Sequence, residues 1–214
     1  MKNLFVGVVF SFVLVGCAPL IIGAGGSASY VAVQERGFKE VGEDLTLKTK
    51  LVNQLTRLNA NYLKDLSINV HQRDVLITGV VQEKNEMQAI EQRARSVDGT
   101  ERVVVALQLK PYPFKQYMKD VATSTNLRTR LIMAKDVYTA NYNITLVKGE
   151  VYLFGWAYTQ QEVGAAVHTA RTTRGVDKVH NYLRVMPNGA EKLRQIERQR
   201  KAYPDSSHGV DQVN

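Results

Sequence analysis

The chain has 214 residues, of which 44% are hydrophobic and 22% charged, and these values are ordinary for a folded globular protein. The formal net charge of +8 favours an acidic partner, such as nucleic acid, anionic lipid or an acidic protein. The single cysteine excludes an intramolecular disulfide and any metal site built from several cysteines.

The N-terminus has the pattern of a secretory signal. Lys2 is followed by an apolar run from Leu4 to Val15, which is shorter than the roughly 20 residues that a transmembrane helix needs. The run ends in Leu14-Val15-Gly16-Cys17, which resembles the lipobox of bacterial lipoproteins. We therefore expect a signal peptide over residues 1–16 and lipid attachment, with palmitate among the acyl chains, at Cys17. Two or three chains at about 0.8 kcal/mol per buried CH₂ would anchor the protein permanently.

The residue after the cysteine indicates the membrane. It is Ala18, whereas an Asp at this place resembles the inner-membrane retention signal of Gram-negative lipoproteins. We expect the outer membrane, on its periplasmic face. Removing residues 1–16 removes only Lys2 among charged side chains, so the mature charge is 8 − 1 = +7. Outside the cytoplasm nucleic acid is not an expected partner, and an anionic phospholipid membrane is. Residues 17–43, which begin rich in Gly and Ala, are predicted to form a flexible tether.

The chain contains an internal repeat. Residues 44–109 align without a gap on residues 120–185 when the sequence is shifted by 76 positions (120 − 44 = 76). One register over the whole block indicates a duplication. The identical pairs include Asp44 with Asp120, Leu51 with Leu127, Leu55 with Leu131, Ile68 with Ile144, Gly79 with Gly155, Glu86 with Glu162, Gly99 with Gly175 and Leu107 with Leu183.

Each copy has the same predicted order of elements, α-β-β-α-β. Leu47, Leu51 and Leu55 recur at helical spacing, and the alternation of Leu66, Ile68 and Val70 predicts a half-buried strand. A turn leads to a second strand ending near Gly79, and a second helix is predicted to end at Gly99, where a C-cap glycine belongs. The predicted fold class is α+β, with each three-stranded mixed sheet covered by two helices.

This order, the glycine closing the second strand and the Val97-Asp98-Gly99 that precedes the last strand together resemble the BON domain. The resemblance implies BON domains at 44–110 and 120–187, with a linker at 111–119. The charged and polar composition that follows predicts a basic helix and then a disordered tail at 188–214. With the lipobox, the whole chain resembles envelope lipoproteins that carry two BON domains and, more distantly, periplasmic BON proteins.

The resemblance implies a non-enzymatic protein that binds anionic phospholipid through its second domain and supports membrane integrity. The first helix of that domain, expected over Asp120–Lys135, is implied to help. Basic residues beside aromatic ones suit a membrane interface. Ala122 and Thr123 stand where similar proteins carry an aromatic residue, so Phe114 or Tyr117 would have to supply it. The candidate phospholipid-binding residues are Lys115, Tyr117, Lys119, Arg128, Arg130 and Lys135.

Two alternatives stay open at this point. The aromatic residues of the linker can instead pack the two domains together, with the lysines merely solvated. The protein can also be a membrane-tethered adaptor that binds an envelope protein partner in an assembly or division complex.

A second aromatic group lies on one strand. If Leu153 faces the core, then Tyr152, Phe154, Trp156 and Tyr158 point to the other face of the sheet. Such a row is a docking face for the other domain or a partner site, and we favour docking.

Nothing in the sequence predicts catalysis, a metal or a cofactor. His71, His168, His180 and His208 have no ligand spacing and are expected at the surface. Glu86 and Glu162 start the second helix of each copy, where a carboxylate favours the helix dipole, and we interpret both as structural.

Overall fold

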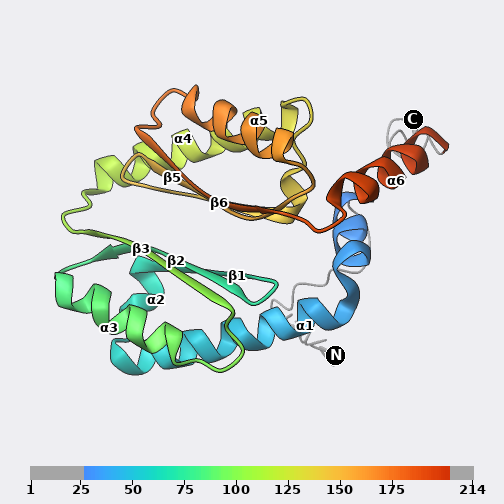
Figure 1. Cartoon of the computed structure of the whole chain (residues 1–214). Helices are drawn as coiled ribbons and strands as arrows, with labels where there is room; N and C mark the ends of the chain where they lie inside the picture. Colours follow the sequence, from blue (N-terminus) through green and yellow to red (C-terminus); the bar gives the residue numbers. More distant parts are fainter. Residues whose placement is uncertain (1–26, 203–214) are drawn as a thin grey trace, which may run out of the picture.

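The computed structural model describes residues 27–202, with side chains described between Lys39 and Lys201, Arg200 excepted. Two units of similar build face one another across their sheets, with helices on the outer sides (Figure 1). The predicted signal peptide and Cys17 lie outside the described residues.

The first unit begins with the long helix α1 (Ser27–Leu58) and the short helix α2 (Tyr62–Asp65). Strands β1 (Leu66–His71) and β2 (Asp74–Val81), helix α3 (Lys84–Arg95) and strand β3 (Arg102–Leu109) follow. The strand order is β1-β2-β3, in which β1 runs antiparallel and β3 parallel to β2. The second unit comprises α4 (Phe114–Met133), the 3₁₀ turn η1 (Thr139–Asn141), β4 (Tyr142–Val147), β5 (Glu150–Ala157), α5 (Gln160–Arg171) and β6 (Lys178–Val185), and α6 (Gly189–Ala202) ends the described chain.

The predicted fold class and duplication are confirmed. β1 and β4, β2 and β5, α3 and α5, and β3 and β6 all begin and end 76 positions apart, as in 142 − 66 = 76. Each unit has its own core between sheet and helices. In the first unit it holds Leu51, Leu55 and Ile77, and in the second Leu127, Leu131 and Leu153.

Two helices begin before the boundaries predicted for their domains, residues 44 and 120. Helix α1 already begins at Ser27, so residues 27–43 are helical and not a flexible tether. No proline interrupts this stretch, and Gly37 and Gly42 each weaken a helix by only about 1 kcal/mol. Helix α4 begins at Phe114, so only residues 111–113 remain of the predicted linker. Pro113 caps this helix, where a missing N–H costs nothing because it has no intrahelical partner.

Gly79 and Gly155 explain why a glycine recurs near the end of the second strand. Their φ angles are 137° and 130°. A Cβ atom on Gly79 would lie 2.1 Å from the carbonyl oxygen of Asp65, and one on Gly155 would lie 2.5 Å from that of Asn141. The chain therefore passes too close at both places for any side chain.

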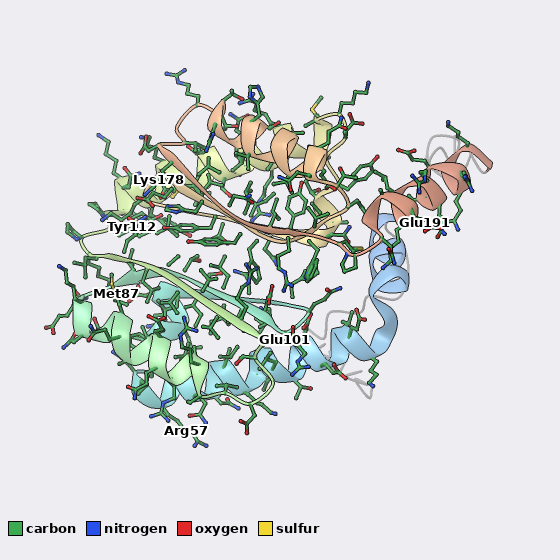
Figure 2. All side chains as sticks on the ribbon, viewed as in Figure 1. Arg57, Met87, Glu101, Tyr112, Lys178 and Glu191 are labelled. Carbon is green, nitrogen blue, oxygen red and sulfur yellow. The ribbon has the colours of Figure 1, made fainter. Side chains whose placement is uncertain are left out.

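The open faces of the two sheets pack against each other. Leu76 and Val80 of β2 meet Val147, Tyr152 and Phe154 of the second unit in a buried apolar cluster. Side chains fill the space between the sheets (Figure 2). The favoured interpretation of the aromatic row as a docking face therefore holds for two of its four members, Tyr152 and Phe154.

The other two members of the row serve a different contact. Trp156 and Tyr158 pack with Met186 and, on α6, with Leu193 and Ile196. The terminal helix thus covers the end of the aromatic row that the first unit leaves open.

Charged groups also join the two units. The Asp74 side chain is only 2% exposed and pairs with Arg102 of its own unit at 2.9 Å and with Arg184 of the other at 3.2 Å. The Arg184 guanidinium also lies 4.3 Å from the centre of the Trp156 ring. Lys148 donates from Nζ to the Leu109 carbonyl at 2.9 Å. These contacts fix the two sheets relative to each other.

Candidate functional site

Helix α4 exposes a ridge of apolar side chains. Its inner face buries Thr123, Leu127 and Leu131 against the second sheet. Successive helical residues are rotated by about 100°, so the residues four, seven and eighteen positions after Phe114 lie on the same side as Phe114, away from the buried face. The exposed fractions on that side are 76% for Phe114, 47% for Met118, 42% for Val121 and 68% for Ile132. We call these four residues the apolar ridge of α4.

Cations and one aromatic residue flank this ridge. By the same helical geometry Lys115 and Lys119 lie along one side, and Tyr117 and Arg128 along the other. Lys115 and Lys119 are exposed, and Tyr117 is 48% exposed. Four of the six predicted lipid-binding residues therefore surround one apolar strip.

The remaining two predicted residues are placed differently. Arg130 turns toward the end of α5 and donates to the Thr172 carbonyl at 2.6 Å and to Thr173 Oγ1 at 2.9 Å. Its guanidinium therefore holds α4 against α5. Lys135 is exposed but lies beyond the end of the helix.

Sequence reasoning overlooked two members of the ridge, Val121 and Ile132. The signal that could have found them is their helical spacing from Phe114, at positions i+7 and i+18. The spacing places these residues on one helical face only if the helix includes Phe114, and the sequence alone predicted a later start.

A buried carboxylate fixes the beginning of α4. Asp120, 3% exposed, accepts a hydrogen bond from the Tyr112 hydroxyl at 2.7 Å and another from Gln116 Nε2 at 2.8 Å. Burial and then this bond raise the pKa of Tyr112. The Tyr112 ring meets the Tyr117 ring edge to face, with centroids 6.0 Å apart. The start of the ridge is therefore held in place and is not free to fray.

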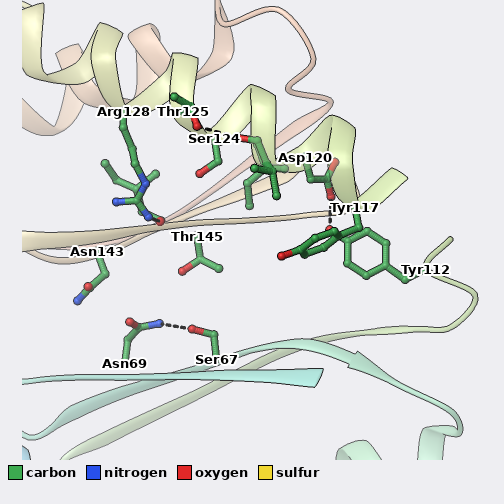
Figure 3. A pocket seen from close by; sticks show the side chains of 13 residues that line it. Ser67, Asn69, Tyr112, Tyr117, Asp120, Ser124, Thr125, Arg128, Asn143 and Thr145 are labelled. Atoms are coloured by element: carbon green, nitrogen blue, oxygen red, sulfur yellow. Dashed lines mark hydrogen bonds between the residues drawn. The ribbon is translucent and has the colours of Figure 1, made fainter. Parts of the chain in front are cut away.

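A groove lies beside the ridge, between the two units. Its polar part is a cavity of about 350 Å³ between β1, β4 and α4. Asn69 and Ser67 of β1 point toward Asn143 and Thr145 of β4, and Arg128 reaches down from α4 (Figure 3). The Arg128 guanidinium donates to the Ile144 carbonyl on the rim of β4.

Two of the three described histidines do not lie at the surface. Contrary to expectation, His71 is buried and His180 is half-buried between the sheets, stacked on the Tyr152 ring at 4.7 Å. His180 Nε2 lies 2.5 Å from Glu150 Oε2. Over the described range, no three His, Cys, Asp or Glu side chains gather as a metal site, and no helix there is both long and apolar enough to span a membrane.

The structural interpretation of Glu86 and Glu162 is confirmed. Glu86 accepts the backbone N–H groups of Gln82 and Glu83, and Glu162 those of Tyr138 and Tyr158. Glu86 therefore caps the start of α3, and Glu162 ties the start of α5 to the segment that holds Tyr138.

Comparison with known proteins assigns the fold. The family model of the BON domain matches residues 44–111 and 119–187. The chain belongs to the BON domain family. It is 28% identical to the outer membrane lipoprotein DolP of Haemophilus influenzae over 169 residues, which cover 78% of this chain and 86% of that protein. The chain is thus a DolP-like protein with two BON domains.

Two further similarities are weaker. An uncharacterized protein of Anaplasma centrale is 27% identical over 122 residues, 56% of this chain and 81% of that one. Among solved structures, the C-terminal domain of CdsD, a structural protein of the type III secretion system of Chlamydia trachomatis, matches at 13% identity with a TM-score of 0.28, over 67% of either chain.

Proposed function

We propose that this protein is a non-enzymatic lipoprotein of the outer membrane, anchored through Cys17 on the periplasmic face. There it binds anionic phospholipid through the second BON domain and supports envelope integrity. The similarity to DolP, an outer membrane lipoprotein by name, supports the location.

The apolar ridge of α4 carries the proposal. Phe114, Met118 and Val121 form a contiguous exposed apolar patch. Such patches are uncommon on soluble proteins and mark contacts with membranes or other proteins. Lys115 and Lys119 flank the patch, and each cation near an anionic surface contributes about 1 kcal/mol. An apolar strip with cations beside it matches a helix lying in the headgroup region of a membrane.

Vesicle binding tests the proposal. The chain from residue 18 onward contains every described element and lacks the acyl anchor, so any binding comes from the protein surface. We expect it to bind vesicles that contain phosphatidylglycerol and to lose affinity with salt. Lys115→Glu with Lys119→Glu should weaken binding at least tenfold, and Phe114→Asp with Met118→Asp should do the same.

The matched control reverses two exposed cations elsewhere, Arg171→Glu with Arg174→Glu at the end of α5. It changes the net charge equally and should retain most of the affinity. Equal losses in both charge-reversal proteins would mean that only net charge matters. No binding to either kind of vesicle would favour the alternative, a tethered adaptor for an envelope protein.

A further inference from the structure

The outer edge of β1 is an unpaired strand edge. β1 is an edge strand of its sheet and pairs only with β2 among the described strands. The two residues of its turn, Gln72 and Arg73, have φ angles of 48° and 64°, as a two-residue hairpin turn requires. In such a hairpin the pair next to the turn, His71 and Asp74, exchanges two backbone hydrogen bonds, and every second pair after it does the same. Ile68 and Val70 belong to the pairs in between, so their N–H and C=O groups point outward from the sheet edge.

In the second domain a side chain caps a carbonyl of the equivalent edge, and none of the described side chains does so in the first. In β4 the Ile144 carbonyl accepts a hydrogen bond from Arg128 of α4. The repeat places Val52 where Arg128 stands and Ile68 where Ile144 stands, since 128 − 76 = 52 and 144 − 76 = 68. Valine has no donor, and between Lys39 and Lys201 no side chain donates to the Ile68 carbonyl. Ile144 is buried, whereas Ile68 is half-buried.

Cavities of different character flank this edge. One of about 280 Å³ lies under α1 and α2, with apolar walls that include Val52, Leu55 and Leu63. The polar cavity of about 350 Å³ described above lies on the other side, toward the second domain. Both cavities contain Ser67 and Asn69 of β1. A strand added beside β1 would place alternate side chains in opposite cavities, because successive side chains of a strand point to opposite faces.

The charge of the groove defines the partner further. Lys48 lines the apolar cavity and Arg128 the polar one. The carboxylate in the polar cavity, Asp120, already accepts hydrogen bonds from Tyr112 and Gln116. The groove therefore has an excess of positive charge available to a ligand.

We propose that the edge of β1 binds an extended segment of another polypeptide as an added strand. The segment alternates apolar residues, which enter the cavity under α1, with acidic ones, which meet Arg128. Strand addition takes its affinity from main-chain hydrogen bonds and its specificity from pockets for alternate side chains. The site lies on the first domain, next to α4 of the second. If α4 binds the membrane as proposed above, the bound segment is held at the membrane surface.

The test uses the full-length protein in detergent and a fluorescent peptide of four Val-Glu repeats, read by anisotropy. Val52→Arg gives the first domain the cap that Arg128 gives the second, and it should weaken peptide binding at least tenfold. Asn53→Arg adds the same charge at the next, exposed position of α1 and should leave binding within twofold. Two further peptides carry N-methyl groups on the backbone nitrogens of all valines or of all glutamates, which removes the N–H donors of one edge of the peptide. At least one of these two peptides should bind at least tenfold more weakly.

Hydrogen exchange gives a measurement on the unmodified protein. Bound peptide should slow exchange of the Ile68 and Val70 amides and leave those of β4 unchanged. No binding of the Val-Glu peptide, or equal binding to both arginine variants, would overturn the proposal. Concentration-dependent dimers that protect the same two amides without peptide would also overturn it, because a second copy would then occupy the edge. Vesicle binding should be the same in Val52→Arg as in the unmodified protein, so the two proposals fail separately.

Discussion

Glu86 and Glu162 show how burial changes one residue of a repeated motif. Burial disfavours the charge on Glu86, but the N–H groups of Glu83 and Gln82 and the Tyr62 hydroxyl outweigh it, and its pKa is lowered. Glu162 is only 1% exposed, and burial raises its pKa although three backbone hydrogen bonds act against the shift. Burial and the bond to Glu86 together raise the pKa of Tyr62 to about 12.

The lowered pKa of Glu86 makes its contribution to stability depend on pH. A carboxyl group whose pKa is lowered by folding stabilises the fold fully when the pH is above its pKa in the unfolded state. This contribution is lost as the pH falls through its pKa in the folded state. Glu86→Gln removes the charge that two N–H groups share, and we expect a loss of about 1 kcal/mol at pH 7. Urea unfolding at pH 7 and again at pH 3.5, below the ordinary value of 4.5, should show this difference shrinking. A difference of the same size at both pH values would contradict the assigned cause.

At the scale of elements, α6 acts as a cover. Trp156, the only tryptophan in the chain, is 7% exposed because Leu193 and Ile196 pack over its cluster. The described charged side chains of α6 are exposed, namely Glu191, Lys192, Arg194, Glu197, Arg198 and Lys201. The helix therefore contacts the second domain through one narrow apolar line.

Ile196→Asp should detach this helix without unfolding either domain. An aspartate without a partner is unfavourable at this partly buried position, so α6 should separate from the Trp156 cluster. We expect a red shift of the tryptophan emission with little change in the unfolding of the β5 core. Gln195→Asp, at the adjacent exposed position, is the control and should leave the emission unchanged. Unshifted emission in Ile196→Asp would mean that α6 does not protect Trp156.

The duplication made most elements predictable, because each pattern occurs twice in one register. The beginnings of α1 and α4 were not predictable in the same way. Residues 114–119 are mostly exposed aromatic, apolar and basic side chains, so they lack the buried apolar stripe that predicts a helix. Without knowledge of burial, such a segment resembles a linker. The contacts of Arg130 were not predictable for a related reason. Its charge is visible in the sequence, but its hydrogen bonds to Thr172 and Thr173 depend on how α4 packs on α5.

At the scale of the molecule, the two domains form one sandwich of sheets. The aromatic row on β5 indicated this contact, since Tyr152 and Phe154 needed cover. The ion pairs were invisible in the sequence, because Asp74 and Arg184 are 110 positions apart and meet only after docking. Asp74 is therefore paired twice, by Arg102 of its own unit and by Arg184 of the other.

Asp74 should therefore couple the domains energetically. Its side chain is 2% exposed, whereas those of Arg102 and Arg184 are 34% and 44% exposed, so water screens part of the interaction. Removing one partner of a fully buried pair costs about 3–5 kcal/mol, and with this screening we expect about 1–3 kcal/mol for Asp74→Asn. Asp98→Asn, at an exposed turn, should cost less than about 0.5 kcal/mol.

A double-mutant cycle separates docking from local effects. Arg184→Ala alone removes one ion pair and the contact with the Trp156 ring. Combined with Asp74→Asn it should cost less than the sum of the two single changes, by about 0.5 kcal/mol or more, because the pair can be lost only once. Unfolding followed by tryptophan emission for the second domain and by hydrogen exchange for β2 would then show both domains weakened together. Additive losses confined to β2 would mean that Asp74 merely completes its own hairpin and that the sheets are held together by Leu76, Val80 and Phe154.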